Sequence, residues 1–213
     1  MRTLVVLLAA VATLSGAPRA ARQDQRPFPP AHLGMLEGPD RDEWQQPDRV
    51  MDELLIAEGD RVADLGAGGG WFTVRLAHRV GPNGVVFAQD IQPAMLESIK
   101  RRVRREALAN VRAVLATPTD PNLEGDLRAV LIVDVYPQLV DPITLLRRVA
   151  ESLAPNGRIG IVDFKTDGAG GPGPDLDERI SPEAIERDAF EAGLTLVKAE
   201  DFLRYQYFLI FSR

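Results

Sequence analysis

The chain of 213 residues is long enough for one α/β domain with a sizeable core, and its 45% of apolar residues indicates a globular protein. The net charge of −6, without a basic patch beyond one helix face, argues against a nucleic-acid substrate. The absence of cysteine excludes disulfides and cysteine-bound metals, and the distant pair His32 and His78 gives no zinc-type spacing, so we expect no metal site.

Residues 1–20 have the pattern of a secretory signal peptide. A positive start precedes an apolar, alanine-rich run from Leu4 to Leu14, and small residues follow. The run of about 11 residues is too short to span a bilayer as a free helix. We therefore expect a secreted or periplasmic protein with no stable membrane span after signal removal. The alternatives are an uncleaved anchor, or a misassigned start codon and hence a cytoplasmic protein.

Residues 21–40 are rich in Arg, Gln and Pro and predict an extended or disordered linker. The folded domain is expected over residues 41–213. At its start, Trp44 is flanked by charged residues. Its side chain is expected either to close over a cofactor or to anchor a helix to the core.

The stretch 62–80 organises the rest of the chain. Val62–Leu65 predicts a short buried strand, Gly66–Gly70 is a glycine-rich loop, and Phe72–Val80 is amphipathic. Strand, glycine loop and helix are the nucleotide-binding half-unit of a doubly wound fold. Glycine lets a ligand approach the backbone closely, and the N–H groups at the start of the helix attract an anion.

Two residues beside this loop bear on which ligand it binds. Trp71 stands where a dinucleotide-binding loop has its third glycine, which disfavours an NAD-linked oxidoreductase. Asp64 precedes the loop and suits a ligand that carries a cation, such as the ammonium of S-adenosylmethionine, whose carboxylate suits the loop N–H groups. The alternative is that Asp64 caps the helix and the glycines only form a turn.

The next strand, Val85–Gln89, ends in Asp90. An acidic residue at this position is placed to bind the two ribose hydroxyls of a nucleoside. Asp90 follows Gly66 by 24 residues (90 − 66), close to the roughly 20 expected.

The remaining pattern alternates helices and strands. Turn residues, Pro and Ser at helix starts and apolar runs predict these elements. The helices are expected at 47–57, from Pro93 to Leu108, at 142–153 and from Ser181, and the strands at 111–116, 129–133, 159–162, 194–199 and 202–211. The basic run Lys100–Arg105 predicts a solvated helix face, with an anionic partner as the alternative.

Six groups of residues occur in an order and spacing that are typical of one known family. They are Asp64–Thr73, Gly81–Gly84, Asp90–Leu96, Asp134–Tyr136, Leu153–Gly157 and Val162–Phe164. Over about residues 41–213 the chain thereby resembles the class I S-adenosylmethionine-dependent methyltransferases. The resemblance implies an α/β fold: a doubly wound, Rossmann-like, seven-stranded and mostly parallel sheet with an antiparallel last strand. It also implies S-adenosylmethionine as the cofactor.

The resemblance further implies which residues bind the cofactor. The ribose would be held by Asp90, and the adenine by Ile91 and by Thr119 or Asp120. The amino-acid end of the cofactor would be held by five residues at the end of the first strand and in the glycine loop: Asp64, Gly66, Ala67, Gly68 and Gly70. The alternative for Thr119 and Asp120 is a role in turn formation alone.

The methyl acceptor is expected beside Asp134, Tyr136 and Gln138, which the resemblance implies as catalytic residues. Relatives often carry a His and an acidic residue directly after the tyrosine, but here these are Pro137 and Gln138. The obvious general base is therefore absent, and Asp134 is either catalytic or structural. We expect a methyltransferase acting on a small molecule, or alternatively an exported non-catalytic member that binds S-adenosylmethionine or another nucleoside-like ligand.

Overall fold

The computed structural model describes residues 27–36, 38–167 and 171–213. The signal peptide expected at 1–20 and the first part of the expected linker lie outside the described residues. Within the described ranges, no helix combines the length and the apolar character needed to cross a bilayer.

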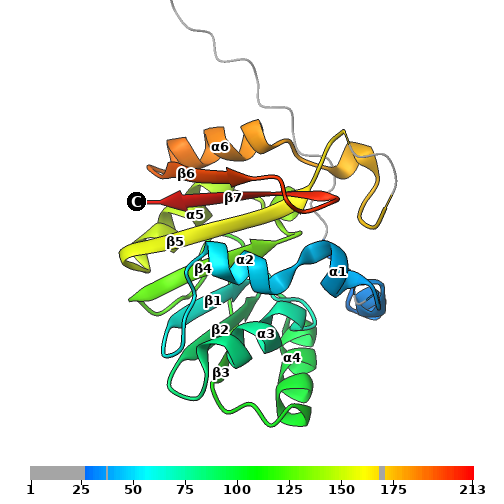
Figure 1. The fold of residues 1–213 in the computed structure, drawn as a ribbon, viewed down its shortest axis with the longest axis vertical. Helices are drawn as coiled ribbons and strands as arrows, with labels where there is room; N and C mark the ends of the chain where they lie inside the picture. Colours follow the sequence, from blue (N-terminus) through cyan, green and yellow to red (C-terminus); the bar gives the residue numbers. More distant parts are fainter. Residues whose placement is uncertain (1–26, 37, 168–170) are drawn as a thin grey trace, which may run out of the picture.

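A single seven-stranded sheet forms the centre of the domain, in the order β3-β2-β1-β4-β5-β7-β6 (Figure 1). The strands are β1 (Arg61–Leu65), β2 (Val85–Asp90), β3 (Val111–Leu115), β4 (Leu127–Val133), β5 (Leu153–Phe164), β6 (Thr195–Glu200) and β7 (Gln206–Ser212). Neighbours from β3 to β5 pair in parallel, whereas β7 is antiparallel to both β5 and β6. The predicted doubly wound sheet with an antiparallel last strand is confirmed.

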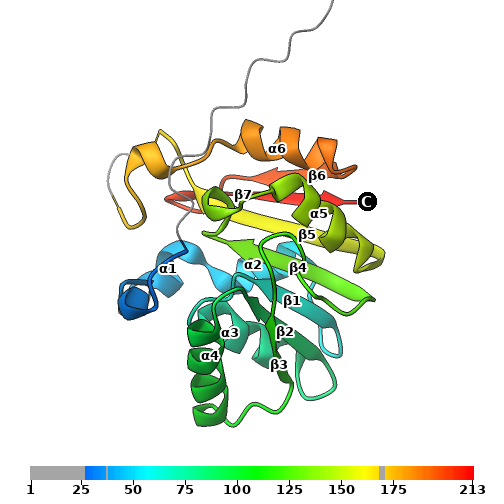
Figure 2. The same cartoon turned by 180° about the vertical axis from the view of Figure 1, so that it is seen from behind.

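Helices cover both faces of the sheet (Figures 1 and 2). They are α1 (Arg41–Gln45), α2 (Pro47–Glu53), α3 (Trp71–Val80), α4 (Pro93–Arg105), α5 (Pro142–Glu151) and α6 (Pro182–Glu191), with 3-10 helices η1 (Pro30–Leu36), η2 (Tyr136–Gln138) and η3 (Leu176–Glu178). One apolar cluster joins α2 and α3 to the sheet, and another joins α5 and α6 to the opposite face. Alternate residues of β1 serve the two clusters because successive side chains of a strand point to opposite faces.

Local sequence signals account for where several helices begin. Asp141 accepts a hydrogen bond from the backbone N–H of Thr144 at 3.1 Å and precedes Pro142, which is a favourable first helical residue. The predicted cap of Ser181 is confirmed, because its hydroxyl accepts from the N–H of Ala184 at 3.4 Å. These helix starts are therefore set by neighbouring residues alone.

The segment before the sheet differs from the expectation of an extended linker. Residues 30–36 form the 3-10 helix η1, and we call residues 27–36 the strap because they run over the cavity described below. Trp44 packs against the rings of Phe164 and Tyr205, with centroids 6.1 and 6.0 Å apart. Its position agrees with the anchoring alternative rather than with a side chain closing over a cofactor.

Candidate active site

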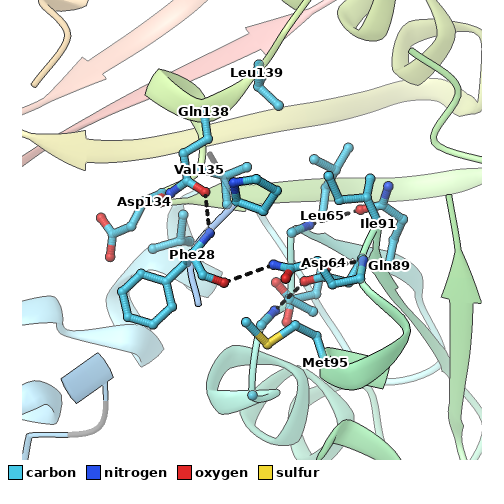
Figure 3. A pocket seen from close by; sticks show the side chains of 18 of the residues that line it. Phe28, Asp64, Leu65, Gln89, Ile91, Met95, Asp134, Val135, Gln138 and Leu139 are labelled. Atoms are coloured by element: carbon cyan, nitrogen blue, oxygen red, sulfur yellow. Dashed lines mark hydrogen bonds between the residues drawn. The ribbon is translucent and has the colours of Figure 1, made fainter. Parts of the chain in front are cut away.

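A cavity of about 260 Å³ lies at the carboxyl ends of β1, β2 and β4 (Figure 3). The strand order reverses between β1 and β4, because β2 and β3 continue on one side and β5 on the other. In open α/β sheets, loops diverge at such a switch point and leave a crevice for a ligand. The expected site at this edge of the sheet is therefore present as a cavity.

Asp64 lies at this cavity near the end of β1. Its side chain is 3% exposed and accepts a hydrogen bond from the Thr73 hydroxyl at 2.6 Å. Burial raises the pKa of Asp64 to about 6, against the lowering effects of Thr73 and of the Arg41 guanidinium. A buried carboxylate beside an open cavity is suited to binding a cation.

The glycine loop approaches the cavity through its first four residues, Gly66–Gly69. Gly66 has φ 71°, and a Cβ there would lie 2.5 Å from a methyl carbon of Val135, so only glycine fits. Gly70 does not line the cavity; it precedes α3 and packs against Ile99, where a Cβ would lie at 3.3 Å. In the structure Gly70 thus packs between α3 and α4, and its expected contact with the cofactor stays a prediction.

Asp90 lines the same cavity as Asp64, at the end of β2. Its carboxylate accepts from the N–H of Gly68 at 3.0 Å and from the N–H of Gln92 at 2.8 Å. Burial raises the pKa of Asp90, although both backbone donors oppose that effect. Ile91 follows and is 39% exposed while lining the cavity, which leaves an apolar face available to a ring.

The loop after β3 contributes different residues from those expected. Thr117 and Pro118 line the cavity, whereas Thr119 and Asp120 do not. The Asp120 carboxylate accepts from the N–H of Asn122 at 2.9 Å and its own N–H donates to the Thr117 hydroxyl at 3.0 Å. Asp120 therefore stabilises a turn, which agrees with the alternative of a role in turn formation.

Of the three expected catalytic residues, Asp134 and Gln138 line the cavity and Tyr136 does not. Tyr136 is fully buried, and its hydroxyl donates to the Asp188 carboxylate at 3.2 Å. The expectation that Tyr136 faces the acceptor is corrected for this reason: the 3-10 turn η2 directs its side chain into the core beneath α6.

Gln138 holds the strap in place. Its side-chain oxygen accepts from the backbone N–H of Phe28 at 3.2 Å, and the Gln92 amide donates to the carbonyl of Phe28 at 3.0 Å (Figure 3). Phe28 therefore bridges the loops that follow β2 and β4. Nothing in the expected linker pointed to this contact, because its partners are 64 and 110 residues away in sequence.

Arg41 is a second residue that sequence reasoning missed. It is the only basic side chain among the described residues that line the cavity. Its guanidinium lies 3.6 Å from the Asp134 carboxylate and 4.3 Å from the centre of the Trp71 ring. In the sequence, only the position of Arg41 near Trp44 in a charged segment could have indicated a role at the site.

Asp134 directly follows β4 and has φ 59°, a left-handed conformation that is uncommon for residues other than glycine. Burial raises the pKa of Asp134 to about 6, and Arg41 and two glutamines counteract it. In Figure 3, Asp134 and Ile91 lie on opposite sides of the cavity. No group of three or more metal-ligating side chains occurs within residues 27–36, 38–167 and 171–213.

Comparisons with known proteins agree with this geometry. Residues 62–157 match the family model described as a methyltransferase domain. A protein named as an uncharacterized methyltransferase of Mycobacterium tuberculosis is 39% identical over 118 residues, which cover 54% of this chain but only 44% of that relative.

Solved structures share the fold. An S-adenosylmethionine-dependent methyltransferase from Aquifex aeolicus superposes with a TM-score of 0.82 at 24% identity, covering 86% of this chain and 98% of that one. The O-methyltransferase NcsB1 from neocarzinostatin biosynthesis, solved with S-adenosylhomocysteine and 1,4-dihydroxy-2-naphthoic acid, has a TM-score of 0.66 at 19% identity, over 81% and 54% of the two chains. Over residues 62–157 the chain is thus similar to methyltransferase domains, and the solved structures show that it shares the fold of S-adenosylmethionine-dependent methyltransferases.

Proposed function

We propose that this protein is an S-adenosylmethionine-dependent methyltransferase that acts on a small-molecule acceptor. The observation that carries the proposal is the convergence of Asp64, Asp90 and the glycine loop on one cavity at the switch point of the sheet. The comparisons do not favour the alternative of a non-catalytic binding protein, since the matched model and the relatives are methyltransferases.

The cavity residues fit the cofactor group by group. The buried Asp64 carboxylate suits the ammonium, and the glycine loop with Arg41 suits the carboxylate. Asp90 suits the ribose hydroxyls, and Ile91 with Met95 offers apolar surface to the adenine. When bound, S-adenosylmethionine supplies a methyl group on a positively charged sulfur.

The protein's own tasks are then positioning and acceptance of a proton. Asp134 is the proton acceptor in this proposal: its pKa of about 6 leaves it ionised at neutral pH but within reach of proton uptake. Gln138 cannot accept a proton, so its role is to hold the strap and orient the acceptor. The solved relative with a bound naphthoic acid supports an acceptor of small, aromatic character.

Calorimetric titration with S-adenosylmethionine tests the binding half of the proposal. We expect Asp64→Asn and Asp90→Asn each to weaken binding at least tenfold, because each removes a charged partner. Asp120→Asn is the matched control, since Asp120 is exposed and does not line the cavity. Equal affinities for all four proteins would refute the proposed cofactor site.

Transfer of a labelled methyl group tests the catalytic half. The acceptors are small aromatic compounds that carry a hydroxyl, an amine or only ring carbons, each offered to the protein with its cofactor. Label in a hydroxyl- or amine-bearing compound supports the proposal. Tight cofactor binding with no label in any of these compounds would instead support a non-catalytic protein.

We also propose export to the periplasm or the medium, on the basis of the charge and apolar pattern of residues 1–20. Intact-mass measurement of the protein purified from its native cells is the test. A mass reduced by about twenty residues supports export, and a full-length mass in the cytosolic fraction contradicts it.

A further inference from the structure

Four side chains from three separate elements close a ring beside the cavity. Arg41 of α1 donates from Nε to the Gln45 side-chain oxygen, and Gln45 donates to the Gln206 side-chain oxygen at 2.9 Å. Gln206 of β7 donates to Oδ1 of Asp134, and Oδ2 of Asp134 lies 3.6 Å from Arg41. Gln45 and Gln206 are 161 residues apart in sequence, so only the fold brings them together.

The ring has a fixed direction because of the chemistry of its members. Arginine only donates, an ionised carboxylate only accepts, and each glutamine between them accepts on one side and donates on the other. Gln45 and Gln206 are fully buried and Arg41 is 7% exposed, so a reversed amide would leave polar atoms unpaired at a cost of about 1–3 kcal/mol. Asp134 therefore receives both remaining donors of the ring, the amide of Gln206 and the guanidinium of Arg41.

Only two members of the ring reach the cavity. Arg41 and Asp134 line it, whereas Gln45 and Gln206 stand behind them. A satisfied buried network of this kind makes its members rigid. Asp134 lies on the side of the cavity opposite Ile91 (Figure 3), and this wall thus presents one fixed anion beside one fixed cation, Arg41.

We propose that Gln206 and Gln45 are positioning residues that fix Asp134 as an ionised hydrogen-bond acceptor, so that the enzyme selects acceptors whose reacting nitrogen or oxygen carries a hydrogen. The inference rests on the proposed function. The acceptor's N–H or O–H donates to the Asp134 carboxylate, and the proton that leaves the acceptor passes to that carboxylate, which becomes a neutral carboxylic acid. An acceptor that lacks such a hydrogen gives no donor to the lone pairs of Asp134 that the ring leaves facing the cavity, and is rejected.

The ionisable groups around Asp134 agree with this assignment. Arg41 of α1, Asp163 of β5 and Tyr207 of β7 interact electrostatically with Asp134. Burial and the neighbouring Asp134 hold the pKa of Asp163 well above its usual range, so Asp163 retains the proton of the pair. Asp134, which has the ring donors, carries the negative charge.

Carboxyl-carbon NMR titration of the protein without cofactor tests the ring independently of activity. In Gln206→Met, which keeps the size of the side chain but removes the donor, we expect the pKa of Asp134 to rise by about one pH unit. Gln206→Glu, which keeps the shape, guards against a folding defect and should raise the same pKa. Gln46→Met is the matched control, because Gln46 neighbours Gln45 but donates outside the ring to the carbonyl of Phe202.

Kinetics with the labelled-methyl panel completes the test. In Gln206→Met, the acidic limb of the rate profile should move to higher pH in step with the NMR value, with kcat reduced about tenfold and KM within about threefold. An unchanged Asp134 pKa, or methyl label on a ring carbon, would overturn the inference. Failure of wild-type protein to bind S-adenosylmethionine would refute the proposed function, whereas the titration of Asp134 would still report on the ring.

Discussion

At the scale of single residues, the site brings together two buried carboxylates and a third that is partly buried, an arrangement that proteins ordinarily avoid. Asp64, Asp90 and Asp134 all line one cavity, and burial raises the pKa of each. Ionisable groups with perturbed pKa values that share a cavity are typical of functional sites. Their desolvation costs free energy, and binding of a ligand can offset that cost.

The desolvation of Asp64 predicts how the free energy of unfolding depends on pH. The pKa of Asp64 rises from 3.8 to about 6 on folding, so the folded protein holds a proton that the unfolded chain has already lost between these values. The free energy of unfolding should therefore fall as pH rises from about 4 to 6, by up to about 3 kcal/mol for this group. Urea unfolding at several pH values measures the fall.

Asp64→Asn should reduce that fall and raise the free energy of unfolding at pH 7 by about 1–2 kcal/mol, since a neutral amide is cheaper to bury. The same variant should bind the cofactor more weakly, so gained stability and lost binding would occur together. A variant that unfolds with the wild-type pH dependence would show that Asp64 is not the group responsible. Asp120→Asn, on the exposed turn, should change neither property.

At the scale of elements, the junction between the glycine loop and the loop after β4 predicts a sharp effect of one methyl group. Gly66→Ala adds a Cβ at 2.5 Å from Val135, in a backbone conformation with φ 71°. We expect it to lower the free energy of unfolding by more than about 2 kcal/mol and to weaken cofactor binding, as measured by urea unfolding and calorimetry.

Gly59→Ala separates the two causes of that effect. Gly59 also has a positive φ, of 86°, but no atom lies within 4 Å of its added Cβ. It should show the conformational cost of about 1–2 kcal/mol without the steric one. Equal losses in the two variants would mean that the contact with Val135 relaxes freely.

The strap makes a prediction about the release of the cofactor. Gln138→Ala removes the acceptor of the Phe28 N–H, and Gln92→Ala removes the donor to the Phe28 carbonyl. Each loss of about 0.5–1.5 kcal/mol should speed cofactor dissociation about 2- to 10-fold in stopped-flow measurements. Only Gln138→Ala should also speed hydrogen exchange at the Phe28 amide.

Asn122→Ala serves as the control for the strap, because its side chain bonds to the carbonyl of Leu115 and does not line the cavity. Wild-type dissociation rates in both glutamine variants would show that the strap does not retain the ligand.

At the scale of the whole molecule, the ligand should stabilise the domain as a unit. Helices α2, α3, α5 and α6 pack on one continuous sheet, and the cavity is formed by residues from the strap, α1, β1, β2 and β4. Binding at one hundred times Kd contributes about 2.7 kcal/mol, which corresponds to a rise in Tm of about 5–10 °C for a domain of this size. A thermal melt with and without S-adenosylmethionine measures it; no rise at saturation would contradict cofactor binding.

The distinction between local and distant signals explains which residues the sequence predicted. Asp64 and Asp90 line the cavity as expected, because Asp64 is the penultimate residue of β1, Asp90 ends β2, and the carboxyl ends of parallel strands meet at one edge of a sheet. Tyr136 was misplaced because a short 3-10 turn decides which way its side chain points, and one position in such a turn separates the cavity from the core.

The sequence by itself determined the doubly wound sheet, the glycine loop and the two carboxylates, since apolar periodicity, turn residues and strand ends are local properties. Only the tertiary structure decided that the strap spans the cavity and that Arg41, Gln45, Gln206 and Asp134 form one ring. The reason is physical: a polar side chain can be satisfied by any donor or acceptor within reach, and the folded packing alone selects which one is near.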